Sequence, residues 1–160
     1  MKLYHGSIEK VELPEIRISN RTLDYGAGFY LTSSYDQAES WVRRKFKGDI
    51  VRGWLNVYEY NPDLETELSV LSFEKPDEQW LDFVMANRMD RDFMHNYDIV
   101  KGPVANDRVY ASFALYEAGI LGKQALISEL KAYKLVNQIL LHSVDALNAI
   151  RFIKAEEILK

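Results

Sequence analysis

The sequence predicts a single α+β domain. Its 160 residues, 48% of them hydrophobic, suffice for one well-buried core and are too few for two. Segments with alternating apolar residues are segregated from segments with helical apolar spacing, and no repeat, low-complexity tract or linker separates them. We therefore expect one domain that spans residues 1–160.

The composition excludes several classes of function. A net charge of −4 and an isoelectric point near 5.4 argue against a general nucleic-acid binder or a protein of anionic membrane surfaces. The absence of cysteine excludes disulfides, thiolate zinc sites and cysteine nucleophiles. No apolar run resembles a signal peptide or reaches membrane-spanning length, so we expect a cytoplasmic protein without a membrane partner.

The first strand is expected over residues 2–5, where it ends at Gly6-Ser7 and places His5 where the strand meets a turn. Residues 8–23 lack periodicity, and they contain Pro14 and the two arginines Arg17 and Arg21. We interpret them as a covering loop that could lie over a ligand.

The central feature is a strand-to-helix corner that follows this loop. Gly26-Ala27-Gly28 permits a tight turn, residues 29–31 form a short strand, and a Thr/Ser cluster begins a helix over residues 34–46. Tyr30 lies late in the strand and Trp41 lies about two turns into the helix. The two rings can therefore face each other across a cleft, although two ordinary core aromatics would have the same spacing.

Spacing and turn residues predict the other elements. Strands are expected over residues 54–60, 67–73, 97–105, 138–143 and 151–154, helices over 76–88, 106–119 and 123–133, and a single capped turn over 143–147.

Common catalytic motifs are absent. No Gly-rich phosphate loop is followed by Lys-Ser/Thr, and Gly26-Ala27-Gly28 does not extend into a dinucleotide fingerprint. His5, His95 and His142 are scattered singly, so we expect no metal site. Ser7 beside His5 lacks the context of a hydrolase nucleophile.

Three fragments together resemble the ADP-ribosyltransferase superfamily, in its His-Tyr-Glu branch. They are Leu3-Tyr4-His5-Gly6-Ser7, Gly26-Ala27-Gly28-Phe29-Tyr30-Leu31-Thr32 and Val136-Asn137-Gln138-Ile139-Leu140-Leu141. The chain is also similar, nearly end to end, to a family of small bacterial proteins in that superfamily, through Gly102-Pro103-Val104-Ala105-Asn106-Asp107 among others. The resemblance implies a split antiparallel β-sandwich with flanking helices.

The resemblance also implies a binding site for NAD, used as a substrate. By this resemblance, His5 bonds the adenosine ribose, the backbone of Gly6 holds the nicotinamide amide, and the Ser7 hydroxyl completes those contacts. Tyr30 and Trp41 form the stacking pair. Arg21 in the covering loop is a further candidate for NAD binding.

The third motif departs from the branch, because Gln138 stands where a glutamate is expected. That carboxylate stabilises the transition state as nicotinamide leaves, and loss of one such group costs roughly 10²–10³ in rate. Asp98, Asp107 or Glu129 could supply an acid instead. We favour Asp107, although a helix cap is its simpler role. Restoring the acid by Gln138→Glu should speed NAD cleavage unless another acid already serves.

The function that the resemblance implies is mono-ADP-ribosylation of an unknown protein or nucleic-acid acceptor. It also suggests a toxin-antitoxin or phage-defence effector with an antitoxin partner, and it implies no metal. A module that binds NAD or ADP-ribose after its catalysis has lapsed is the alternative, and an interaction domain that keeps only the fold is a third possibility.

Overall fold

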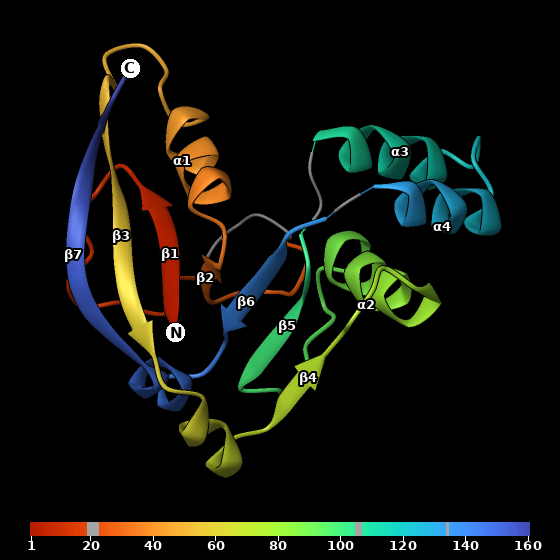
Figure 1. Ribbon diagram of the computed structural model, residues 1–160. Coiled ribbons are helices and arrows are strands. Elements are labelled where there is room, and N and C mark those ends of the chain that lie inside the picture. The colour runs from red at the N-terminus through yellow and green to blue at the C-terminus, as the bar shows by residue number, and fades with distance from the viewer. Residues whose placement is uncertain (19–22, 105–106, 134) are drawn as a thin grey trace.

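The computed structural model describes residues 1–18, 23–104, 107–133 and 135–160, except for the side chains of Asp107 and Arg108. The chain forms, in order, β1 (Lys2–Ser7), β2 (Phe29–Thr32), α1 (Tyr35–Arg43), β3 (Arg52–Tyr60), the 3₁₀ helix η1 (Pro62–Glu67), β4 (Val70–Ser72), α2 (Glu78–Met89), β5 (Ile99–Pro103), α3 (Asp107–Glu117), α4 (Lys123–Ala132), β6 (Asn137–Leu141), the 3₁₀ helix η2 (Asp145–Ala149) and β7 (Ile150–Leu159). The predicted α+β class is confirmed (Figure 1).

Several elements have other bounds than predicted: β1 continues through Gly6 and Ser7, where the predicted strand ends, and the turn expected over 143–147 is η2. Two strands differ most. The strand expected over 67–73 is only β4, because the turn that begins at Asn61 continues as η1; the Asn61 side chain accepts a hydrogen bond from the Asp63 amide. The strand expected over 151–154 is instead β7, which pairs with β3 along its whole length. Most of β7 is only partly buried, so its apolar pattern is weak and understates its length.

The strands form a seven-stranded sheet in the order β4-β5-β6-β2-β1-β3-β7. The β4–β5 pair is parallel and the other neighbours are antiparallel. The join between β1 and β2 is unusual, because these strands pair at a single position, Tyr4 with Thr32. The sheet therefore consists of two halves that meet at one point.

Both helical layers cover one face of the sheet, on different halves (Figure 1). On the β1–β3–β7 half, α1 packs Ala38 and Val42 against Leu55 and Val57 of β3. On the β5–β6 half, α2, α3 and α4 pack around Val100 and Leu140, in a cluster whose largest members include Trp80, Phe113, Leu126 and Leu130. The opposite face has its own core, which includes Leu3, Leu31, Tyr58, Ile99 and Leu141.

Strand alternation places polar groups in the gap between these helical layers. In β2, Phe29 and Leu31 join the core of the face opposite the α-helices, so Tyr30 and Thr32 face the α-helices. In β6, Ile139 and Leu141 do the same, so Gln138 faces the helices as the direct partner of Thr32. The gap over β2 and β6 is thus lined by polar side chains in an otherwise apolar region.

Tyr25 is the polar anchor of the larger core. The ring is fully buried, its hydroxyl donates to the Pro103 carbonyl at 2.8 Å, and the same oxygen accepts from Trp80 Nε1 at 2.8 Å. One hydroxyl therefore links the segment before β2 to β5 and α2.

We predict that Tyr25→Phe lowers the free energy of unfolding by about 1–3 kcal/mol, because it leaves the Trp80 and Pro103 groups buried without partners. Urea unfolding would measure the change. Tyr97→Phe is the matched control, since this ring is 38% exposed; its effect should stay within about 0.5 kcal/mol. Equal effects of the two substitutions would contradict the anchoring role.

Candidate functional site

The site begins where the β1–β2 ladder stops. Beyond Tyr4 and Thr32, continued pairing would satisfy the backbone carbonyl of Tyr30 from β1. The His5 side chain satisfies it instead, with Nδ1 donating to the Tyr30 oxygen at 2.7 Å. The imidazole also stacks on Phe29, with ring centroids 4.3 Å apart. One side chain thus holds the two halves of the sheet together while leaving them open.

This environment keeps His5 neutral. Burial lowers the pKa of His5 to about 4; the hydrogen bond to the Tyr30 carbonyl opposes the shift, and nearby Lys45 and Arg17 add to it. Because Nδ1 carries the proton, Nε2 has a lone pair that can accept a hydrogen bond. No partner for Nε2 is found among the residues that the structure describes. His5 can therefore receive a ligand hydroxyl.

The turn before β2 depends on its two glycines, as the sequence predicts. Gly26 has φ 89° and Gly28 has φ 147°, a region that side chains disfavour. A Cβ at Gly28 would also collide with the Leu141 carbonyl oxygen. The turn therefore closes tightly against β6.

Side chains, not a ladder, satisfy the carbonyls of this turn. The donors are His95 Nε2 to Tyr25 at 2.7 Å, the Tyr30 hydroxyl to Gly26 at 2.6 Å, and His142 Nδ1 to Ala27 at 2.6 Å. The two histidine rings lie 4.3 Å apart. The turn is consequently fixed from three directions.

The Tyr30 ring forms a side of the site, and its hydroxyl is not suited to act as an acid catalyst. Its hydroxyl donates to the Gly26 carbonyl and accepts from the Tyr25 amide at 3.1 Å. Burial raises the pKa of Tyr30 well above its ordinary value. The hydroxyl thus stays protonated at neutral pH, and it holds the ring in a fixed position.

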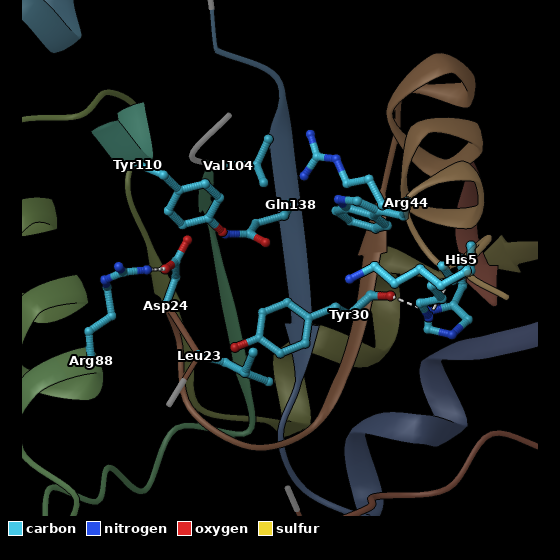
Figure 2. Close-up of a pocket in the computed structure, with 13 residues that line it drawn as sticks. His5, Leu23, Asp24, Tyr30, Arg44, Arg88, Val104, Tyr110 and Gln138 are labelled. Atoms are coloured by element: carbon cyan, nitrogen blue, oxygen red, sulfur yellow. Dashed lines mark hydrogen bonds and ion pairs between the residues drawn. The ribbon is translucent and has the colours of Figure 1, made fainter. Parts of the chain in front are cut away.

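A pocket of about 480 Å³ lies between α1 on one side and α2 and α3 on the other (Figure 2). It is lined by His5, Gly6, Leu23, Asp24, Tyr30, Trp41, Arg44, Lys45, Lys47, Arg88, Val104, Tyr110 and Gln138. The volume is within the range of small-molecule sites.

Helix α1 supplies the basic side of this pocket. A Cβ at Gly6 would collide with the carbonyl oxygen of Ala38, so only glycine allows α1 to lie this close to β1. The close packing brings Trp41 to the pocket, and Arg44, Lys45 and Lys47 follow at the end of the helix. Nζ of Lys45 donates to the Gly6 carbonyl at 3.1 Å. Several positive charges therefore border one end of the pocket.

The opposite end contains a buried acid. Asp24 is 6% exposed, and Arg88 of α2 donates to its Oδ1 at 3.3 Å. Gln138 is 3% exposed, and its Nε2 has no hydrogen-bond partner among the described residues. The Gln138 amide lies near enough to favour the charged form of Asp24, although it does not reach hydrogen-bond geometry. This end of the pocket thus retains unused hydrogen-bonding capacity.

Five of the predicted site residues come together in the pocket: His5, Gly6, Tyr30, Trp41 and Gln138. Ser7 does not line it, because its Oγ accepts from the Glu9 amide where β1 ends. Arg21 and the side chain of Asp107 lie outside the described residues.

Two alternative acids from the sequence lie elsewhere. Asp98 accepts hydrogen bonds from Ser69, and Glu129 accepts one from the Ser112 hydroxyl; neither lines the pocket. Sequence reasoning missed Asp24, together with its partner Arg88 and with Tyr110. The available signal was an acid directly before the predicted glycine turn.

The family comparison covers this whole arrangement. A family described as "Protein of unknown function (DUF3990)" matches residues 1–152. The chain belongs to this family. The DUF3990 match includes every residue that lines the pocket. No curated protein and no solved structure matches the chain.

The described residues lack two further features. They contain no group of three or more His, Cys, Asp or Glu side chains that could hold a metal ion. None of their helices combines the length and the apolar composition needed to cross a membrane.

We predict that His5 contributes stability that is lost in acid. Above pH 6.5 the residue is neutral in both states; as the pH falls toward 4, the unfolded chain binds a proton that the folded His5 refuses. At about 1.4 kcal/mol per pKa unit, the loss approaches about 3 kcal/mol. Urea unfolding at several pH values should show a smaller loss in His5→Gln than in wild type. Nuclear magnetic resonance should detect neutral, Nδ1-protonated His5 at pH 5; a charged ring there would contradict the assignment.

Proposed function

We propose that this DUF3990 protein is a mono-ADP-ribosyltransferase, which cleaves the nicotinamide–ribose bond of NAD and transfers ADP-ribose to an acceptor. The observation that carries the proposal is the convergence of His5, Gly6, Tyr30, Trp41 and Gln138 on one pocket. These residues come from the three separate fragments that resemble the superfamily and from the helix that follows the second. An arrangement that kept only the fold would not need all of them around one cavity.

The shape of the sheet supports the same proposal. A single residue pair joins β1 to β2 and divides the sheet into a β1–β3–β7 half and a β2–β6–β5–β4 half. This division fits the split β-sandwich that the resemblance implies. The pocket lies beside the join, where His5 replaces the ladder.

The chemistry of the lining fits NAD. Nε2 of His5 can accept a hydrogen bond from a ribose hydroxyl, and the rings of Tyr30 and Trp41 offer flat surfaces for a planar base. The cations at the end of α1 suit a diphosphate. The buried Nε2 of Gln138 has no hydrogen-bond partner in the described part of the chain, and a ribose hydroxyl would supply one.

A module that binds NAD without cleaving it is the second candidate. The observation that favours it is Gln138, whose amide carries no charge to stabilise a cationic transition state. Nicotinamide release distinguishes the two candidates, because only the transferase produces it.

We predict that the purified protein transfers label from ADP-ribose-labelled NAD to a macromolecule in a cell lysate. His5→Ala and Tyr30→Ala should abolish the transfer, because they remove the ribose contact and the stacking wall. Tyr97→Phe, outside the pocket, should leave it unchanged. Circular dichroism would establish that the variants are folded. Absence of label in every lysate, with NAD still bound, would favour the binding module.

We predict that Trp41→Ala weakens NAD binding roughly five- to 150-fold, since stacking on an aromatic side chain contributes about 1–3 kcal/mol per base. Trp41→Phe keeps a flat ring and should lose less than about threefold. Isothermal titration calorimetry would measure both constants. Equal losses in the two variants would contradict the stacking role.

A further inference from the structure

The acidic end of the pocket contains one carboxylate. Among the described residues that line the pocket, Asp24 is the only acid. It lies in the segment that leads into the turn at Gly26, one residue before the Tyr25 anchor. Hydrogen bonds fix Tyr25 through its amide, its carbonyl and its hydroxyl. The adjacent Asp24 is therefore held in place as well.

The carboxylate has one oxygen engaged and one directed into the pocket. Oδ1 accepts from Arg88 Nη1 at 3.3 Å. In Figure 2 the other oxygen points toward Tyr110 and the Gln138 carboxamide, away from Arg88. Arg88 is itself fixed, because its Nε donates to Glu117 at 3.3 Å and its guanidinium lies over the rings of Tyr110 and Phe113. This orientation leaves one carboxylate oxygen available to a ligand.

Resting on the transferase activity proposed above, we propose that Asp24 is the catalytic carboxylate, and that it stabilises the positive charge that develops on the nicotinamide ribose. Gln138 beside it then orients a ribose hydroxyl through its amide. Asp24 would thus supply the negative charge, and Gln138 would supply the hydrogen bond to the ribose.

The reaction requires no further reagent beyond an acceptor. The bond from the nicotinamide nitrogen to ribose C1′ breaks, and its electron pair leaves with neutral nicotinamide. The ribose becomes oxocarbenium-like, and a nearby carboxylate stabilises such a cation. A hydroxyl of the acceptor, or water, then bonds to C1′ and releases its proton to solvent.

Arg88 favours the ionised form of this acid and holds the carboxylate in place. Burial raises the pKa of the Asp24 carboxyl above its ordinary value, and the Arg88 guanidinium opposes the increase. In the part of the chain that the structure describes, the ionisable or polar groups that face Asp24 or Arg88 are Tyr25, Tyr30, Arg88, Tyr110, Glu117 and Gln138. Arg88 is the cation in that set, so it acts as a positioning residue.

A purely structural role is the competing explanation, in which the Asp24–Arg88 pair only attaches the turn to α2. The two roles differ in what Arg88→Gln does. If the pair is structural, Arg88→Gln and Asp24→Asn should act alike at every pH. If Asp24 is catalytic, Arg88→Gln should lose activity at low pH and recover as the pH rises, because the Asp24 pKa is higher without Arg88.

The experiment measures NAD binding by calorimetry and nicotinamide release for the full chain. Asp24→Asn preserves the shape and should bind NAD within about threefold of wild type, while releasing nicotinamide roughly 10²–10³ times more slowly. Asp82→Asn, which removes an equal charge from a side chain that is 60% exposed on α2, is the control and should match wild type. Thermal unfolding would establish that each variant is folded.

A double variant keeps the test informative if Asp24→Asn is partly unfolded. Asp24→Asn/Gln138→Glu moves the carboxylate to the neighbouring position. It should release nicotinamide at least tenfold faster than Asp24→Asn alone. Gln138→Glu alone should gain little, since two carboxylates in one small site raise one pKa.

The outcomes separate this inference from the proposed function. If Asp24→Asn releases nicotinamide at the wild-type rate, the role of Asp24 is wrong, whereas the proposed transferase activity is unaffected. Bound NAD with no release from wild type would overturn both the transferase and Asp24, and would leave the binding module. The assignment is supported if Asp24→Asn binds NAD normally but releases nicotinamide slowly, and if the double variant regains the rate of release.

Discussion

The hydrogen bond from His5 to the Tyr30 carbonyl is the contact on which the site depends. If β1 and β2 paired along their whole length, the sheet would have no room for a pocket where they join. If the two strands only separated, buried backbone carbonyls would lose their hydrogen-bond donors. The imidazole resolves this conflict, because it reaches across the opening and supplies the missing donor. The same bond fixes the tautomer that leaves Nε2 as an acceptor. Sheet architecture and binding chemistry thus share one side chain.

The turn before β2 follows the same principle. Its consecutive carbonyls accept from His95, Tyr30 and His142, and the preceding Tyr25 hydroxyl joins it to α2 and β5. The donors come from separate segments, namely the loop after α2, β2 itself and the residue after β6, so side-chain contacts rather than a ladder hold the turn. Rigid placement of Tyr30 and Asp24 is the consequence. A pocket wall built this way does not need to reorganise when a ligand binds.

The sequence predicted those features that depend on local chemistry. Glycines at 26 and 28 indicated the turn, because both adopt the positive φ that glycine tolerates. Gln138 was singled out by the resemblance alone, and strand alternation places its side chain at the pocket. The length of β7 could not be predicted, since a partly buried edge strand lacks a clear apolar pattern. Asp24 was missed for a different reason. Its importance depends on burial beside Gln138 and on Arg88, which is 64 residues away in the chain, and no local pattern records such a contact.

The charges around the pocket give a proposed dinucleotide substrate one direction of binding. Arg44, Lys45 and Lys47 border one end, whereas the Asp24–Arg88 pair at the other end is nearly neutral overall. A diphosphate is therefore attracted to the end of α1, and a cationic nicotinamide would be repelled from it. At the other end, the Asp24 oxygen that is directed away from Arg88 favours that positive group instead. Because the basic end attracts the diphosphate and repels the nicotinamide, reversing the substrate would be unfavourable there, and the scissile bond would lie beside Asp24 and Gln138.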